Sequence, residues 1–243
     1  MKILIPVLFT ALSFVACADA AVITPHNATV LDSNKDERVL KNFTGVVTGG
    51  PIHVIVKIGM KEGVRFEGDA EAISTLVTEV KGKVLIIRPK TSWTSWAKKY
   101  ENKKITAYVT AKDITSLAMS GNGSLTVTSE LTARDFAATL SGSGSLKAKV
   151  NTDNLTAVIS GSGNLMLSGE ADEADVTLSG SGKLSGKDLK IDILSTRISG
   201  SGNVTAHVED LIKAKISGSG HVYYTGYASI EEKVIGSGGI TKL

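Results

Sequence analysis

The sequence predicts an all-β protein, a parallel β-helix or β-solenoid whose coils of about 18–21 residues turn at Gly-Ser-Gly corners. Three observations support this class. A short glycine-rich phrase recurs through the second half of the chain at a nearly constant step. The residues on both sides of each copy alternate between apolar and polar, as in a strand. The 4 prolines all precede these repeats, and proline would remove a donor from a continuous ladder.

The repeated phrase has its clearest form at Leu140, where it reads Leu-Ser-Gly-Ser-Gly-Ser-Leu. Glycine adopts positive φ without steric cost, so the chain can reverse direction at each copy. A flexible Gly-Ser linker would not carry apolar residues in fixed phase on both sides. We therefore expect stacked structural turns, separated by 21, 19, 19, 20, 18 and 18 residues, at Gly121, Gly142, Gly161, Gly180, Gly200, Gly218 and Gly236.

The alternation assigns each flanking residue to a face. Leu146, Ala148 and Val150 are expected to point inward, whereas Lys147 and Lys149 point outward. Each repeat then consists of a strand, a polar corner and a returning strand. Such a pair cannot bury its own apolar face, but coils stacked about 4.8 Å apart can share one narrow core.

The last repeat is degraded and differs at one inward position. Glu232 stands where Ala214 stands one repeat earlier. A charge at an inward position discourages further pairing at an open sheet end.

The segments before the repeats predict an irregular start to the same domain. Strands are expected over residues 38–46, 53–58, 63–68 and 83–87, and from Ile105 onward. Residues 69–79 suggest one or two helical turns with Asp69 as the cap. The predicted organisation is a signal peptide at 1–20, a flexible lead-in at 21–37 and one domain at 38–243, irregular over 38–110 and regular over 111–243.

The first 20 residues are typical of a secretory signal. Lys2 precedes an apolar run that ends at Ala16, and Ala18-Asp19-Ala20 resembles a cleavage site. Cys17 is the sole cysteine, and it is either a lipidation site or removed with the signal. No later segment is long enough for a membrane-spanning helix. We expect an exported protein that is periplasmic, secreted or held at the outer surface.

The chain from about Arg38 to Leu243 also resembles a known family. The similarity lies in the run from Arg38 through Phe43, Gly45, Pro51 and Gly59, in Gly68–Ile73, and in Leu85–Ile87 followed by Gly-Ser-Gly coils. Together they resemble the putative auto-transporter adhesin, head GIN domain family of exported bacterial proteins. The resemblance implies a β-helical fold and an adhesin-like role, and it implies no catalytic residues.

Aromatic and basic residues gather between the two halves, at Trp93, Trp96, Lys98, Lys99 and Tyr100. One interpretation is a contact patch, in which aromatic rings stack on sugars or sit at a membrane interface while lysines meet anionic groups. The other is a structural loop whose tryptophans cover an open flank of the solenoid.

A second candidate binding surface lies in the repeats. Arg197, Lys215 and Lys233 each stand three residues before a corner glycine. This shared offset predicts a basic ladder across neighbouring coils, which would bind an anionic polymer or remain a solvated strip.

Signals for catalysis and cofactors are weak. Gly180-Ser181-Gly182-Lys183 lacks the first glycine and the hydroxyl residue of a phosphate-binding loop. The positions five residues after each corner glycine, where an enzyme on a solenoid face would need paired carboxylates, carry no acid. The four histidines lack ligand spacing, and the acidic residues of the far corners fit backbone-bonding turns better than a cation row. No cofactor or metal is expected.

These features favour a non-catalytic scaffold or adhesion-type module. A net charge of +3 gives no reason to expect nucleic acid. The expected partners are a glycan, an envelope polymer or a surface protein. Two alternatives stay open, a polysaccharide-active β-helix enzyme and membrane contact through Trp93 and Trp96.

Overall fold

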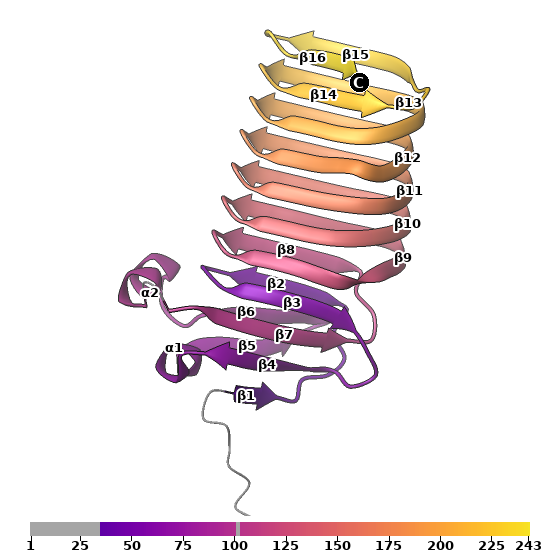
Figure 1. The fold of residues 1–243 in the computed structure, drawn as a ribbon. Coiled ribbons are helices and arrows are strands. Elements are labelled where there is room, and N and C mark those ends of the chain that lie inside the picture. Colours follow the sequence, from indigo (N-terminus) through magenta and orange to yellow (C-terminus); the bar gives the residue numbers. More distant parts are fainter. Residues whose placement is uncertain (1–34, 101–102) are drawn as a thin grey trace, which may run out of the picture. The chain divides into compact units, whose positions relative to one another are not determined.

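The computed structural model describes residues 35–100 and 103–243, which belong to one compact unit. This unit is a parallel β-solenoid, so the predicted fold class is confirmed (Figure 1). The signal segment, Cys17 and most of the lead-in lie outside the described residues.

The regular part consists of long strands that each run through a whole coil. Consecutive strands pair in parallel, so that Leu146 lies beside Leu165 and Ile159 beside Leu178. Each long strand contributes its first half to one sheet and its second half to another. These strands are β9 (Ser124–Gly142), β10 (Ser145–Gly161), β11 (Asn164–Gly180), β12 (Lys183–Gly200) and β13 (Asn203–Gly218).

Two sheets can therefore be distinguished. The first sheet joins the first halves of β9–β13 to β3 (His53–Ile58), β7 (Ile105–Ala111), β14 (His221–Thr225) and β16 (Gly239–Lys242). The second sheet joins their second halves to β2 (Gly45–Gly49), β6 (Val84–Pro89), β8 (Ser116–Gly121) and β15 (Ser229–Ile235).

The Gly-Ser corners lie directly above one another. The first glycine of each copy has φ between 107° and 123°. The carbonyl of Gly161 accepts hydrogen bonds from the N–H groups of Ser181 and Gly182 on the next coil, at 2.9 and 2.8 Å. A Cβ added to Gly180 would lie 2.6 Å from that same carbonyl oxygen. Both the backbone conformation and this close approach require glycine.

The polar corners opposite the Gly-Ser corners were expected to separate two strands, but they do not. Strand pairing continues through them, and Thr152 is buried there. Its hydroxyl lies within hydrogen-bonding distance of the carbonyl oxygens of Arg134 and Asn154, at 2.9 and 3.1 Å. A side chain that satisfies corner carbonyls lets the ladder bend without ending.

The core follows the predicted alternation. The residues expected inward are buried and Lys147 and Lys149 are exposed. Alanine often fills the middle inward position, as at Ala148 and Ala157.

The N-terminal part interleaves its strands. β2 pairs with β6 and β8, and β3 pairs with β7 and β9, so segments distant in sequence complete the lower coils (Figure 1). β4 (Gly63–Gly68) and β5 (Leu76–Lys81) add antiparallel strands. The predicted helical stretch is shorter than expected: α1 spans Ala70–Ser74 and Asp69 caps it, but the chain then turns into β5 because it pairs with β6.

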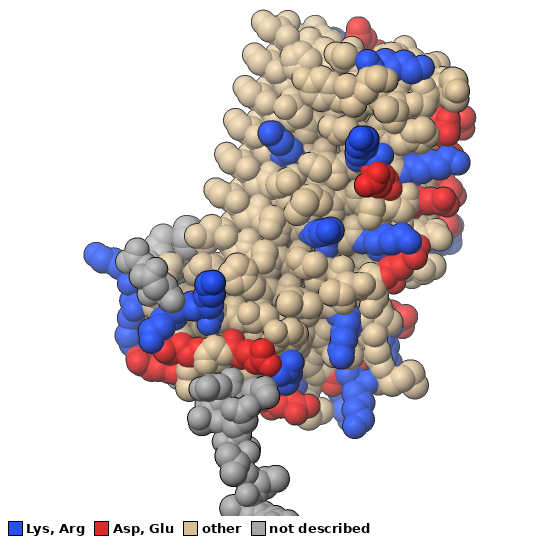
Figure 2. Space-filling view, in the orientation of Figure 1, with Lys and Arg blue, Asp and Glu red and all other residues tan. Residues whose placement is uncertain are grey.

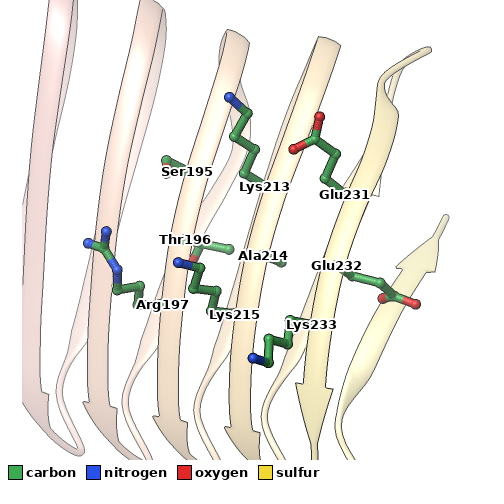
Figure 3. Close-up of a pocket in the computed structure, with 9 residues that line it drawn as sticks. All are labelled: Ser195, Thr196, Arg197, Lys213, Ala214, Lys215, Glu231, Glu232 and Lys233. Carbon is green, nitrogen blue, oxygen red and sulfur yellow. The ribbon is translucent and has the colours of Figure 1, made fainter.

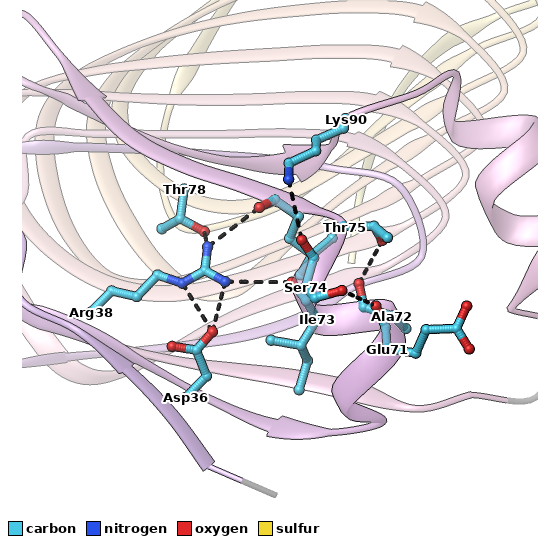
Figure 4. A network of polar contacts seen from close by, with 10 residues as sticks. Asp36, Arg38, Glu71, Ala72, Ile73, Ser74, Thr75, Thr78 and Lys90 are labelled. Carbon is cyan, nitrogen blue, oxygen red and sulfur yellow. Dashed lines mark hydrogen bonds and ion pairs between the residues drawn. The ribbon is translucent and has the colours of Figure 1, made fainter.

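The lead-in also ends earlier than predicted. β1 (Lys35–Arg38) pairs with β4 instead of remaining part of a flexible segment. The Arg38 guanidinium contacts the Asp36 carboxylate at 2.7 Å and donates to the Thr78 hydroxyl at 2.8 Å (Figure 4). It also lies 4.8 Å from the centre of the Phe66 ring. These contacts hold β1 against β4 and β5.

The C-terminal coil is the open end of the stack. Glu232 pairs with Ala214 as predicted, yet it is exposed because no coil covers it. Four of the six large hydrophobic residues exposed in the described part of the chain lie in this coil: Tyr227, Ile230, Ile235 and Leu243.

Candidate functional site

The predicted basic ladder forms a column on the second sheet. Arg197 lies beside Lys215 and Lys215 beside Lys233, on three consecutive coils. All three side chains are exposed and project from the same face (Figure 3). None makes a hydrogen bond or an ion pair with another residue of the described chain. We call these three residues the basic column.

A hollow lies on each side of this column. The one in Figure 3 measures about 450 Å³ and continues to Ser195, Lys213 and Glu231. Lys213 lies beside Glu231 in the ladder, so charges of both signs line this side.

The other hollow, of about 370 Å³, lies between the basic column and the Gly-Ser corners. Its far wall contains Ser179, Ser199 and Ser217, which are exposed and aligned in register. We call these serines the serine column and the hollow the ridge groove. The groove crosses several coils, so an extended ligand would lie along the stack.

The aromatic segment forms a short helix and not the expected loop. α2 spans Trp93–Lys99. Trp96 and Tyr100 are 3% and 6% exposed, and their ring centres lie 5.1 Å apart. The Trp96 indole donates to the Thr75 hydroxyl at 2.7 Å. Both rings pack against the solenoid, which is the position that a structural cover requires.

Ion pairs connect α2 and the residues that follow it to α1 and its N-cap. Lys99 contacts Glu71 at 3.0 Å and Lys103 contacts Asp69 at 2.7 Å. The bond from Lys103 lowers the pKa of Asp69, and the bond from Lys99 lowers the pKa of Glu71. The pKa of Lys99 is raised by Tyr100 and then by Glu71, and that of Lys103 is raised by Asp69.

Two members of the aromatic segment remain, Lys98 and Trp93. Lys98 is exposed. The side chain of Trp93 lies outside the described structure, as does Cys17. The contact-patch hypothesis therefore has Lys98 as its open described member.

The family model described as "Putative auto-transporter adhesin, head GIN domain" matches residues 42–228, which is most of the chain. The chain belongs to this head GIN domain family. The resemblance seen in the sequence is thereby confirmed.

Solved structures share the fold of this head GIN domain. A protein of Bacteroides fragilis NCTC 9343, described as a putative adhesin, has a TM-score of 0.76 at 20% identity, over 86% of this chain and 96% of its own. A protein of Parabacteroides distasonis ATCC 8503, described as a putative lipid binding protein, has a TM-score of 0.67 at 22% identity, over 87% of this chain and 98% of its own. A putative adhesin of Parabacteroides merdae ATCC 43184 has a TM-score of 0.67 at 19% identity, over 86% of this chain and 95% of its own. No curated protein sequence matches.

The first sheet of this head GIN domain has a surface unlike that of the second sheet, which carries the basic column. Uncharged residues dominate it, with several basic side chains among them, and both acidic and basic side chains lie along the edge away from the Gly-Ser corners (Figure 2). Tyr223 stacks on His221 with ring centres 5.8 Å apart. The positions five residues after each corner glycine form one aligned column without an acidic residue: Thr126, Lys147, Met166, Ser185, Thr205, Tyr223 and Thr241.

The described part of this head GIN domain contains neither a metal-binding cluster nor a membrane-spanning helix. No group of three or more His, Cys, Asp or Glu residues is arranged there to hold a metal ion. No helix among the described residues is long and apolar enough to cross a bilayer. The acidic far corners instead contain local contacts, such as that from the Asn154 amide to Asp135 at 2.9 Å.

Proposed function

We propose that this chain is a non-catalytic exported binding module, adhesin-like or acting as a scaffold in the cell envelope. The observation that carries the proposal is the register of its outward residues. Equivalent side chains on successive coils form straight columns, such as the basic column, and do not converge on a deep pocket. A surface of parallel columns suits an extended ligand better than a small substrate.

The family and the solved structures support the coarser part of this proposal. The family and one of these structures are described as putative adhesins, and another structure is described as a putative lipid binding protein. The finer part, that the ligand is a glycan, an envelope polymer or a surface protein, rests on the columns of Thr, Ser and Lys on the sheet faces.

Binding to fractionated cell envelopes tests the proposal. The purified chain from residue 21 onward should be retained by one polymer class from a panel of cell-wall and glycan fractions, and heat-unfolded protein should not. Retention by none of them, together with turnover of a polysaccharide seen as new reducing ends, would favour the enzyme alternative.

Membrane contact is a second candidate because one structural neighbour is described as a putative lipid binding protein. Liposome sedimentation tests it. Binding that survives replacement of Trp93 and Lys98 by alanine would not arise from the aromatic segment.

We further propose that residues 1–20 direct export, with Cys17 as a lipid anchor or as part of the removed signal. Labelling of cells with a fatty acid separates the two. Incorporation that disappears in Cys17→Ala supports the anchor, and a mature chain beginning at Ala21 excludes it.

A further inference from the structure

The ridge groove has walls of two different chemistries. One wall carries the cations of Arg197, Lys215 and Lys233. The other carries the hydroxyls of Ser179, Ser199 and Ser217 and, on the last coil, the exposed apolar side chain of Ile235. Outward residues two apart on a strand are separated by about 6.6 Å, which sets the distance between the walls. Along the groove, both columns repeat once per coil, at about 4.8 Å.

The basic column is electrostatically unusual within this fold. Like charges placed side by side on neighbouring strands repel one another and destabilise the sheet. Elsewhere the same register is used to neutralise a lysine: Lys149 lies beside Glu130 on the adjacent coil and contacts it at 2.9 Å. In the basic column each cation instead has a cation beside it, with Thr177 at the next position.

The unpaired cations point to an anionic ligand that spans several coils. A single small anion would engage one or two of them, whereas a chain with repeated acidic groups engages all three. Arginine offers a planar pair of donors to a carboxylate or sulfate, and lysine offers a compact charge.

The serine column narrows the class of ligand. Hydroxyl groups along the opposite wall can exchange hydrogen bonds with the hydroxyls of a sugar chain. Single-stranded nucleic acid is bound by aromatic platforms as well as by charge, and none of the residues that line the groove is aromatic. A flat bilayer surface would not enter a groove of this width.

We propose that the ridge groove binds an acidic polysaccharide, extended along the stack, with its acidic groups on the basic column and its hydroxyls against the serine column. A sugar unit spans roughly one coil spacing of about 4.8 Å, so acids on successive sugars can reach successive coils. This proposal rests on the proposed function as a binding module and names its ligand class and site.

Calorimetric titration of the chain from residue 21 onward with defined oligosaccharides tests the proposal. The probes are an oligouronate, the same oligomer with its carboxyls reduced, and a sulfated oligomer of equal length. At least one acidic oligomer should bind roughly tenfold more tightly than the neutral one, and its affinity should fall with rising salt.

Matched variants locate the site. Replacement of Arg197, Lys215 and Lys233 by glutamine should weaken binding of the acidic oligomer roughly tenfold. Replacement of Lys147, Lys183 and Lys190, three exposed lysines of the first sheet, removes the same charge and should leave the affinity within about twofold. Ser199→Ala with Ser217→Ala should weaken both acidic and neutral oligomers.

The outcomes separate this proposal from the broader one. Equal losses in the two triple variants, or equal affinity for acidic and neutral oligomers, would overturn the acidic groove while leaving a binding module. Equal or tighter binding of polyphosphate or of anionic vesicles would also overturn the assignment to a glycan. Retention of no polymer from any envelope fraction would contradict the proposed function itself.

Discussion

At the scale of single residues, two buried threonines occupy opposite situations. The Thr196 hydroxyl is buried and has no hydrogen-bond partner among the described residues, whereas the Thr152 hydroxyl contacts two carbonyl oxygens. An unsatisfied buried hydroxyl carries a desolvation cost that valine, of nearly the same shape, avoids. We expect Thr196→Val to raise the free energy of unfolding by up to about 1 kcal/mol and Thr152→Val to lower it by about 1–2 kcal/mol. Chemical denaturation measures both, and equal effects would contradict the assignment.

Gly180 and Gly82 separate two reasons for glycine, a positive φ and the close approach of neighbouring backbone. Its φ is +108°, and an added Cβ would lie 2.6 Å from the backbone of the coil below, whereas Gly82 has φ +61° with open space around it. Gly82→Ala should therefore cost about 1 kcal/mol of backbone strain. Gly180→Ala should cost about 2–3 kcal/mol or more, since neighbouring backbone must move as well. Similar shifts in the melting temperatures of the two variants would show that the close approach contributes little.

At the scale of elements, the contact between α2 and α1 should depend on pH. The folded pKa values of Asp69 and Glu71 are lowered from the ordinary 3.8 and 4.5, so their contribution is complete above those values and is lost as pH falls through the lower folded values. Lys99 and Lys103 have pKa values raised from 10.5, so their contribution is complete below pH 10.5 and is lost as pH rises through the folded values.

The contact should thus hold between about pH 4.5 and 10.5 and loosen in acid before the solenoid unfolds. Both tryptophans lie on this segment, so their fluorescence should shift to the red while the far-ultraviolet dichroism stays constant. Asp69→Asn combined with Glu71→Gln should remove the acid-induced step. A step of unchanged size in that variant would assign it to other groups.

Some elements could be predicted from the sequence because one physical signal decided them. In the repeats, glycine fixes each corner and the alternation of Leu146 to Val150 fixes each face. The stretch from Ile73 to Val80 fits a helix by spacing, but pairing with β6 outweighs that local preference after α1. The cations of the ridge groove were visible from their constant offset to the corners. Its serine wall was missed, although a serine precedes Gly180, Gly200 and Gly218, because two columns become one groove only in the folded register.

At the scale of the whole described unit, one end of the stack is covered by other strands and the other end is not. The N-terminal end is covered by antiparallel strands, and Arg38 ties β1 to the segment that follows α1. The C-terminal end leaves β15 and β16 as edges, and β15 itself carries the exposed Ile230 and Ile235. An exposed apolar edge favours pairing with another chain, and a solenoid needs some feature that limits it.

Glu232 is that feature, since it places a charge in the inward row between Ile230 and Val234. A second chain docked on this edge would bury an unpaired carboxylate, which costs well over the 1.4 kcal/mol that corresponds to about a tenfold change in affinity. We therefore expect Glu232→Val to strengthen self-association at least about tenfold, as measured by sedimentation velocity over a range of protein concentrations. Glu231→Val is the matched control, because it removes the same charge from the adjacent outward position and leaves the inward row intact. Equal self-association of the two variants would show that net charge, and not the inward carboxylate, keeps this end free.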